Sequence, residues 1–264
     1  MIFLGVFLNK PHKNQHAQYV FNNKNQTVRL LKREVLIIGS QIIEQLAKNA
    51  LFEGLNLHDL EDLLPHTTYN QLKQDDVIFN KGDKSNDLFL ILSGRVKIQN
   101  QSEDGKTLIH DMLNPNSFFG ELGLIENKPR VACAVCLTDC TIASISRSYF
   151  LTLINKHPII SLKVMAKMSN SLRNTNEFLE NIVFFNLATR LAKLLKVLAS
   201  KYGKDSADGI DFDIKISQGE LANLVGSSRE SVNKQLKKWE DEGKVKMLEN
   251  GRMFVSKDLV YSRG

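Results

Sequence analysis

The sequence predicts an α+β protein with an antiparallel β-roll of jelly-roll-like form, one long helix and a smaller C-terminal module. Three patterns carry this prediction. Short alternating runs follow Pro65 at close, regular intervals, and such spacing is typical of antiparallel rolls and barrels. An apolar seven-residue repeat follows Pro158, and two capped helical segments separated by a glycine follow residue 216.

The composition is that of an ordinary globular protein. Of the 264 residues, 42% are hydrophobic and 24% are charged, and the formal net charge is +6, which allows about two domains with cores of their own. The middle of the chain is acidic and its C-terminal part is basic. This asymmetry fits a sensor joined to a module that binds a polyanion, or else a chance distribution over solvated faces.

The first forty residues carry no pattern from which a function can be predicted. The apolar run Met1–Leu8 is too short to cross a bilayer, and it lacks the flanks of a secretory signal. Residues 9–27 are rich in Asn, Gln, Lys and His, a composition typical of disorder. We therefore expect a cytoplasmic protein with no membrane partner, in which residues 1–40 are a poorly ordered extension or follow a misassigned start.

The next hundred residues alternate between one helical pattern and several strand patterns. Residues 41–64 have helical periodicity, and Pro65 is expected to end that helix. Strands are expected at 77–79, 88–92, 95–98 and 107–109. Asp104-Gly105 lies between two of them and predicts a two-residue hairpin turn with positive φ at both central residues.

Three cysteines, Cys133, Cys136 and Cys140, have a spacing that suggests an iron–sulfur or zinc site. They lie in a segment that reads as strand, where residues three apart point to opposite faces. The sequence contains no fourth cysteine. We therefore interpret them as buried structural thiols and expect no metal site.

The segment after Pro158 predicts a helix that pairs with its own copy. Apolar residues recur at alternating spacings of three and four, and Thr175 is the one polar residue inside the repeat. The predicted seam consists of Met165, Met168, Leu172, Leu179 and Ile182. A seam of this length predicts a two-fold homodimer, and the alternative is an amphipathic helix packed on its own domain. Asn186 is expected to cap a further helix over 187–199.

The C-terminal module has the pattern of a winged helix-turn-helix. A short strand is expected within 210–216. Helices are expected over 218–225 and from 227 to about 241, with Gly226 between them. Both starts show Ser followed by Glu three residues later, at Ser217 and Ser227, the pattern of a capping box. Asn250-Gly251 then lies between two alternating runs and predicts a β-hairpin wing.

The second of these helices is the expected DNA-reading element. Val232, Leu236 and Trp239 form its buried side. The N-terminal residues of such a helix contact bases: arginine pairs with guanine and glutamate accepts from cytosine. Hydroxyl and backbone N–H groups at helix starts suit phosphate. The residues predicted to bind duplex DNA are Ser217, Gln218, Ser228, Arg229, Glu230, Asn233 and Lys234. Taken singly, Glu230 reads equally well as a capping-box partner, and the basic residues read as a solvated face.

Two segments resemble a known family. Residues 118–132, Phe-Phe-Gly-Glu-Leu-Gly-Leu-Ile-Glu-Asn-Lys-Pro-Arg-Val-Ala, resemble the phosphate-binding cassette of cyclic-nucleotide-binding domains. Residues 221–232 resemble the helix-turn-helix of the cyclic AMP receptor protein/Fnr family. The resemblance extends from about residue 45 to the end. It implies a cyclic-nucleotide-binding domain over 41–157, a dimerisation helix over 158–185 and a DNA-binding domain over 186–264.

The cassette residues have the chemistry that a cyclic nucleotide needs. A glycine at position 120 allows close approach of the backbone. Glu121 can accept a hydrogen bond from the ribose 2′-hydroxyl, and Arg130 can pair with the cyclic phosphate. The resemblance implies a nucleotide site made of Gly120, Glu121, Leu122, Arg130, Val131, Thr175 and Asn176. In the family, the last two positions meet the base from the dimer helix, Thr175 within one subunit and Asn176 from the other.

Three positions depart from the receptor. Val131 stands where the receptor has serine, and an apolar residue there resembles cyclic AMP sites rather than cyclic GMP sites of kinases. Ser171 stands where the receptor's helix carries an arginine that contacts the ligand. Lys234 replaces a recognition-helix arginine and lacks its fork. The Arg229–Glu230 pair still implies half-sites resembling TGTGA.

The resemblance implies a regulator without catalytic residues or a covalent cofactor. Cyclic AMP is its expected allosteric effector, and duplex DNA, a second copy of the chain and RNA polymerase are its expected partners. Iron–sulfur and haem sensing are disfavoured because residues 1–132 contain no Cys and no His stands out as a ligand. An enzyme is disfavoured because no P-loop or nucleophile elbow is found. The alternative is the same architecture binding DNA constitutively or sensing a different ligand.

Overall fold

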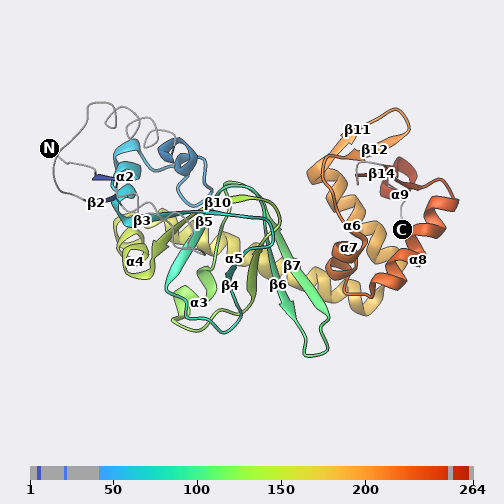
Figure 1. The fold of residues 1–264 in the computed structure, drawn as a ribbon, viewed down its shortest axis with the longest axis horizontal. Coiled ribbons are helices and arrows are strands. Elements are labelled where there is room, and N and C mark those ends of the chain that lie inside the picture. Colours follow the sequence, from blue (N-terminus) through green and yellow to red (C-terminus); the bar gives the residue numbers. More distant parts are fainter. Residues whose placement is uncertain (1–4, 7–20, 23–41, 249–251, 262–264) are drawn as a thin grey trace. The chain divides into compact units, whose positions relative to one another are not determined.

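The computed structural model describes residues 5–6, 21–22, 42–248 and 252–261 (Figure 1). The chain divides into two compact units. The first comprises Met1–Asn100 and Asp111–Asn170, and the second comprises Gln101–His110 and Ser171–Gly264. Within the predicted extension, strands β1 (Gly5–Val6) and β2 (Phe21–Asn22) pair antiparallel, and the rest of residues 1–40 lies outside the described ranges.

Two four-stranded sheets form the roll of the first unit, with strand orders β3-β10-β5-β8 and β4-β9-β6-β7. Their strands are β3 (Thr67–Leu72), β4 (Val77–Phe79), β5 (Asp87–Ser93), β6 (Val96–Gln101), β7 (Thr107–Leu113), β8 (Phe118–Phe119), β9 (Cys133–Cys136) and β10 (Cys140–Ser146). Strand β10 pairs antiparallel with both β3 and β5. The predicted antiparallel roll is confirmed.

The hairpin between β6 and β7 forms with a different turn from the one predicted. The amide of Gly105 donates to the carbonyl of Ser102 (3.0 Å), and the amide of Ser102 donates to the carbonyl of Lys106 (2.8 Å). Only Gly105 has a positive φ, 83°. The loop is therefore a three-residue connection that ends in a left-handed glycine. The prediction of a two-residue turn was wrong.

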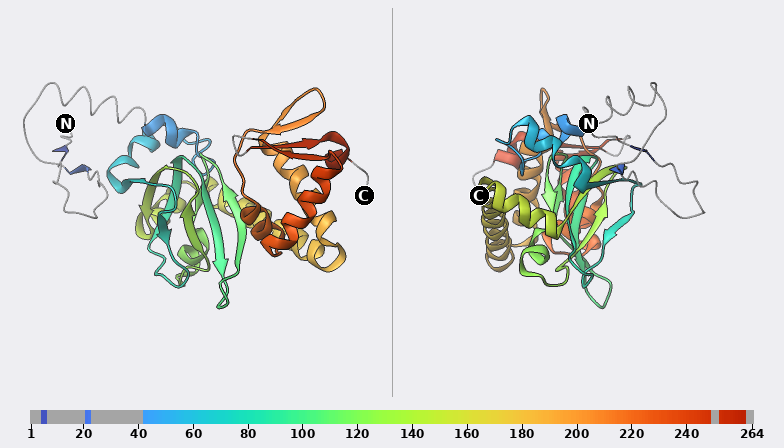
Figure 2. Two further views of the ribbon diagram at one scale, coloured as in Figure 1. Left: turned by 45° about the vertical axis from the view of Figure 1, so that its right-hand side comes forward. Right: turned by 90° about the vertical axis from the view of Figure 1, so that its left-hand side faces the viewer.

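The predicted single helix over 41–64 is also wrong. A helical segment at 42–47 is followed by a turn and then by α2 (Leu57–Glu61) and the 3₁₀ helix η1 (Leu64–His66). The side chain of Asn49 accepts from the amide of Leu51 (3.1 Å) and so competes with helix continuation. Gly54 then adopts a φ of +94°. Figure 2 shows the segment 42–47 and α2 close together beside the strands.

The remaining helices of this unit are α3 (Glu121–Glu126), α4 (Arg147–Lys156) and the first part of the long helix α5 (Ile159–Phe184). Ile160 and Val164 lie on one side of α5 and are buried. The predicted seam is exposed: Met165 is 52% exposed, Leu172 64% and Leu179 60%. No helix in the described ranges combines the length and apolar character of a membrane span.

The second unit folds around helix α6 and a four-stranded sheet of order β11-β12-β14-β13. Its further elements are α6 (Leu187–Tyr202), β11 (Gly203–Asp205), β12 (Gly209–Phe212), α7 (Gln218–Val225), α8 (Arg229–Asp241), β13 (Val245–Met247), β14 (Met253–Ser256) and α9 (Lys257–Tyr261). Asn186 caps α6 as predicted, accepting from the amide of Thr189. Strands β13 and β14 pair as the predicted wing, and its Asn250-Gly251 turn lies outside the described residues.

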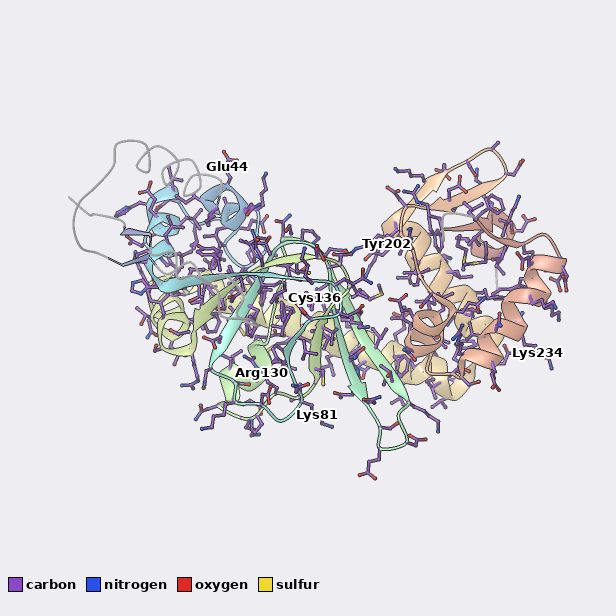
Figure 3. The ribbon with its side chains drawn as sticks, in the orientation of Figure 1. Glu44, Lys81, Arg130, Cys136, Tyr202 and Lys234 are labelled. Carbon is purple, nitrogen blue, oxygen red and sulfur yellow. The ribbon has the colours of Figure 1, made fainter. Side chains whose placement is uncertain are left out.

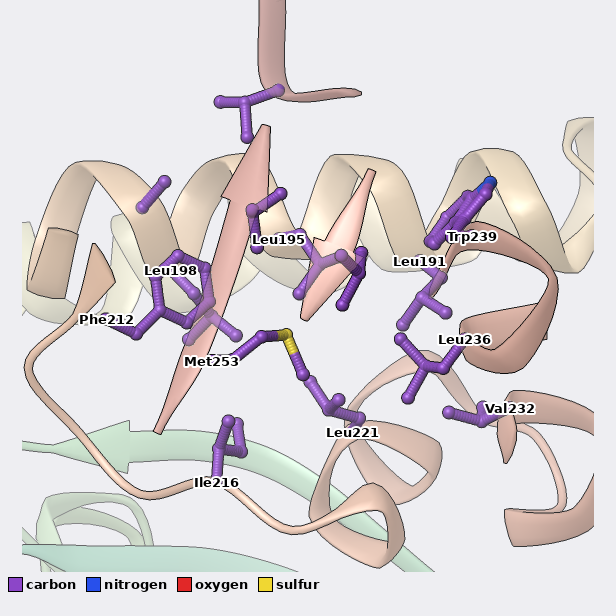
Figure 4. Close-up of a cluster of buried hydrophobic side chains, with 14 of the residues drawn as sticks. Leu191, Leu195, Leu198, Phe212, Ile216, Leu221, Val232, Leu236, Trp239 and Met253 are labelled. Atoms are coloured by element: carbon purple, nitrogen blue, oxygen red, sulfur yellow. The ribbon is translucent and has the colours of Figure 1, made fainter. Parts of the chain in front are cut away.

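One hydrophobic core joins these elements. Leu191, Leu195 and Leu198 of α6 pack in the same cluster as Leu221 of α7 and Leu236 of α8 (Figure 4). All five side chains are at most 4% exposed. This core fixes the two helices of the helix-turn-helix against α6 and so sets the orientation of α8 within the unit.

Candidate functional site

The centre of the first candidate site is the turn that joins β8 to α3. Gly120 precedes α3 with a φ of 85°, a conformation that side chains on Cβ disfavour. A Cβ on Gly120 would also lie 2.5 Å from Nη1 of Arg130. Glycine is therefore required twice here, by the backbone conformation and by the close approach of the guanidinium.

Arg130 is buried against this turn, with 5% of its surface exposed (Figure 3). Its Nη1 donates to the carbonyl of Gly120 (2.7 Å), and its Nη2 donates to the carbonyl of Asp87 (2.6 Å). The guanidinium carbon lies 4.3 Å from the ring centroid of Phe79 and 5.2 Å from that of Phe89. Aromatic faces and carbonyl oxygens thus hold the group in place.

The charge of this guanidinium is only partly compensated. Burial lowers the pKa of Arg130, and the nearby carboxylates of Asp87, Asp83 and Glu121 oppose that shift. Burial likewise raises the pKa of Asp87, and the charge of Arg130 opposes this rise. Within the described ranges, no carboxylate forms a direct ion pair with Arg130. A buried cation in this state favours an anionic ligand.

Two buried polar atoms beside the same turn have no hydrogen-bond partner among the described residues: Nε of Arg130 and Oγ of Ser85. A Cβ on Gly123 would lie 2.2 Å from the Ser85 hydroxyl, so this serine lies directly against α3. Buried polar groups usually have partners. A guanidinium N–H and a hydroxyl left over at a glycine-containing turn fit the oxygens of a phosphate.

Glu121 is the second charged group of the cassette, and it is 5% exposed. Its Oε2 lies 2.8 Å from Nζ of Lys167 on α5. The Lys167 ammonium also donates to the carbonyl of Phe118 and lies 4.6 Å from the centroid of that ring. The predicted nucleotide site did not include Lys167, Ser85 or Asp87.

A signal for Lys167 was present in the sequence. Val164 comes four residues after Ile160, and Lys167 comes three residues after Val164. This spacing places Lys167 on the side of α5 that packs against the roll. The predicted seam lies on a neighbouring side of the same helix, and Lys167 is not part of its repeat. No comparable local signal marks Ser85 or Asp87, because both reach the cassette through tertiary contacts.

The other predicted nucleotide-site residues are more accessible. Leu122 is half-buried on α3, and Val131 is 54% exposed directly after Arg130. Thr175 and Asn176 lie on exposed turns of α5, in the second unit. The Thr175 hydroxyl donates to the carbonyl of Ser171 (2.9 Å), so its own helix satisfies it.

The three cysteines are free thiols, and Cys133 is only half-buried, so the prediction of burial is wrong for that residue. Cys136 and Cys140 are buried in one apolar cluster of the roll, and burial raises the pKa of Cys136 to about 12. A thiol in that state is a poor metal ligand. Within the described ranges, no three His, Cys, Asp or Glu side chains are grouped to hold a metal ion.

The second candidate site is the helix-turn-helix. Helix α7 starts with the predicted capping box, in which Ser217 accepts from the amide of Glu220 (3.1 Å) and the Glu220 carboxylate accepts from the amide of Ser217 (2.8 Å). Gln218 follows as the first residue of α7, half-buried. Gly226 ends α7 with a φ of 64°.

The predicted capping box of α8 is wrong. Its N-cap is Ser228, whose Oγ accepts from the amide of Ser231 (3.2 Å). The register is thus one residue later than the Ser227–Glu230 pattern suggested. Since Glu230 is not the capping partner, its carboxylate is available for other contacts.

Helix α8 separates its buried and exposed sides clearly. Val232, Leu236 and Trp239 are buried as predicted, and Lys234 extends outward from the helix (Figure 3). The predicted base-contacting residues of this helix are all exposed: Arg229, Glu230, Asn233 and Lys234. In the part of the chain that the structure describes, none of their charged groups forms an ion pair. Such a helix can enter a major groove without first breaking internal contacts.

Family models match the two segments of the chain that contain the candidate sites. A family model described as "Cyclic nucleotide-binding domain" matches residues 69–157, and one described as "Crp-like helix-turn-helix domain" matches residues 189–259. The two models therefore cover the cassette and the helix-turn-helix separately, in the predicted order.

Among curated proteins, the chain is 34% identical over 185 residues to the "cAMP-activated global transcriptional regulator CRP" of Escherichia coli, covering 69% of this chain and 87% of that one. It is 29% identical over 213 residues to the "CRP-like cAMP-activated global transcriptional regulator" of Mycobacterium tuberculosis, covering 81% and 95%. Among solved structures, the global regulator CLP of Xanthomonas campestris, described as c-di-GMP responsive, aligns with a TM-score of 0.68 at 24% identity, covering 76% and 99%. That last likeness concerns the fold.

Proposed function

Because the chain belongs to the cyclic AMP receptor protein/Fnr family of transcription regulators, we propose that it is a dimeric regulator that binds palindromic DNA in response to cyclic AMP. It is a DNA-binding regulator with a cyclic-nucleotide-binding domain, and not an enzyme. The choice of cyclic AMP, the dimer and the palindrome are the parts that we propose.

The observation that carries the proposal is the state of Arg130. This guanidinium is 5% exposed and lies against a left-handed glycine, and its Nε has no hydrogen-bond partner among the described residues, so it suits the cyclic phosphate. Val131 favours adenine over guanine in this interpretation. It offers no hydroxyl to the base, and it is 54% exposed at the cassette rather than packed in the core.

The dimer is supported by the exposed apolar side of α5. Met165, Leu172 and Leu179 are each more than half exposed at heptad spacing, and a seam of this kind costs free energy unless a partner covers it. A second copy of the chain presents the same repeat, so a two-fold pair buries both. By the family resemblance, Thr175 and Asn176 would meet the base from this seam.

The proposed mechanism is a shift between two states. The nucleotide binds the cassette and the seam helix of the dimer, favours one arrangement of the subunits, and so orients two copies of α8 for half-sites about one DNA turn apart. The wing and the serines at the starts of α7 and α8 would contact phosphates. RNA polymerase is the proposed partner at the promoter, since the curated relatives are global transcriptional regulators.

The test is a fluorescence-anisotropy titration of a labelled palindrome with two TGTGA-type half-sites, at one fixed salt concentration because phosphate contacts make affinity steeply salt-dependent. Binding is measured without nucleotide, with cyclic AMP and with cyclic GMP. We expect cyclic AMP alone to tighten binding by about tenfold or more. DNA binding that is equally strong without nucleotide, with cyclic AMP and with cyclic GMP would refute cyclic AMP as the effector. It would support the alternative that the protein binds DNA constitutively.

Two variants sharpen the result. Lys234→Ala should weaken DNA binding in every condition because it removes an exposed cation of α8. Lys196→Ala is the control, since Lys196 is an exposed lysine of α6 and does not belong to the recognition helix. Equal losses in both variants would show that general charge, and not α8, accounts for the binding.

A further inference from the structure

We propose that Lys167 is a positioning residue of the nucleotide site: it holds Glu121 in the orientation that receives a ligand hydroxyl, and it ties α5 to the strand leading into the cassette. This inference rests on the proposed function, because it concerns the same site.

The contacts of Lys167 join three elements. Its ammonium pairs with Oε2 of Glu121 at 2.8 Å, donates to the carbonyl of Phe118 and lies over the Phe118 ring. Phe118 belongs to β8 and Glu121 begins α3, so one side chain of α5 holds both ends of the turn at Gly120.

Burial makes this pair different from a surface ion pair. The Glu121 side chain is 7% exposed and that of Lys167 is 22% exposed, and a buried carboxylate needs a compensating partner. A carboxylate has two oxygens and about four acceptor positions. The ammonium pairs with Oε2, which leaves acceptor capacity for a ribose hydroxyl. Lys167 therefore prepares Glu121 for the ligand rather than competing with it.

Helix α5 supplies a matched control one turn earlier. Lys163 pairs with Glu53, but that glutamate side chain is 74% exposed. The pair joins α5 to a surface turn and involves no cassette residue, so its removal should cost little. Lys167→Met and Lys163→Met make the same chemical change on the same helix. Only Lys167→Met removes a contact to Glu121.

The first experiment measures calorimetric binding of cyclic AMP and of 2′-deoxy cyclic AMP to the full-length protein and its variants. We expect the wild type and Lys163→Met to prefer the ribose form by about tenfold or more, the effect of a hydrogen bond to a charged acceptor. Lys167→Met should lose most of this preference, and Lys167→Arg should retain part of it. If Lys167→Met prefers cyclic AMP over 2′-deoxy cyclic AMP as strongly as the wild type does, the proposal is overturned. The preference is a ratio within each variant, so general destabilisation cannot imitate its loss.

The second experiment needs no ligand and separates this inference from the proposed function. Amide hydrogen exchange in residues 118–126 should be faster in Lys167→Met than in the wild type, and unchanged there in Lys163→Met. If the wild type binds neither nucleotide, the proposed function fails and with it the hydroxyl role, while the exchange data still decide whether Lys167 holds the cassette. Unchanged exchange in Lys167→Met would refute the tie between α5 and β8.

Discussion

Replacing Gly120 by alanine should damage the effector site through two separable effects. The first is backbone strain: an alanine at a φ of 85° costs about 1–2 kcal/mol in folding free energy. The second is steric: the new Cβ would lie 2.5 Å from Nη1 of Arg130, closer than such atoms approach, so the guanidinium must move. Gly105→Ala is the control, because Gly105 has a φ of 83° with no heavy atom within 4 Å of its Cβ position.

Both variants should therefore lose stability in thermal or urea unfolding, Gly120→Ala at least as much as Gly105→Ala because of the added steric clash, and only Gly120→Ala should lose affinity for the effector. Displacing Arg130 removes one or more charge-assisted hydrogen bonds to phosphate, worth about 1.5–3 kcal/mol each. The dissociation constant for cyclic AMP should rise about 10- to 150-fold, measured by calorimetry. The reasoning fails if Gly120→Ala binds the nucleotide like the wild type, or if Gly105→Ala loses affinity to the same extent.

Three further predictions concern the rest of the chain. Leu195→Ala should destabilise the second unit by about 2–5 kcal/mol in urea unfolding, because Leu195 is fully buried, while the 44% exposed Val197 should tolerate alanine within about 0.5 kcal/mol. Leu172→Glu should convert the dimer to monomers in sedimentation-velocity experiments, and the off-seam Asn170→Glu should not; dimers of both variants would contradict the seam. The hydrogen bond from Lys106 lowers the pKa of Asp104 from 3.8 to about 2, so this pair should contribute stability above pH 3.8 that is lost as the pH falls through 2. In an NMR titration the Asp104 carboxyl should titrate near pH 2 and return toward 3.8 in Lys106→Met, and a wild-type midpoint near 3.8 would contradict the pairing.

Local signals predicted most elements because their causes are local. Gly226 ends α7, Ser217 and Glu220 form the capping box, and Asn186 caps α6; each acts through hydrogen bonds within a few residues. The errors arose where two local signals competed. Ser227 and Ser228 both suit an N-cap, and the structure uses the second. In the same way, Asn49 bends back on its own backbone and interrupts a periodic helical pattern.

The candidate site likewise has features that local sequence predicts and features that depend on tertiary contacts. The sequence alone predicted the cassette, through its resemblance to a known family, and the seam and the reading side of α8, through heptad spacing and an amphipathic pattern in consecutive residues. Only the tertiary structure decided the partners of the two charged cassette groups. Arg130 reaches the carbonyl of Asp87, and Glu121 meets Lys167, across sequence separations of 43 and 46 residues. Such pairs depend on how α5 and the roll pack together, since burial brings polar groups of distant segments to whichever partner the packing leaves within reach.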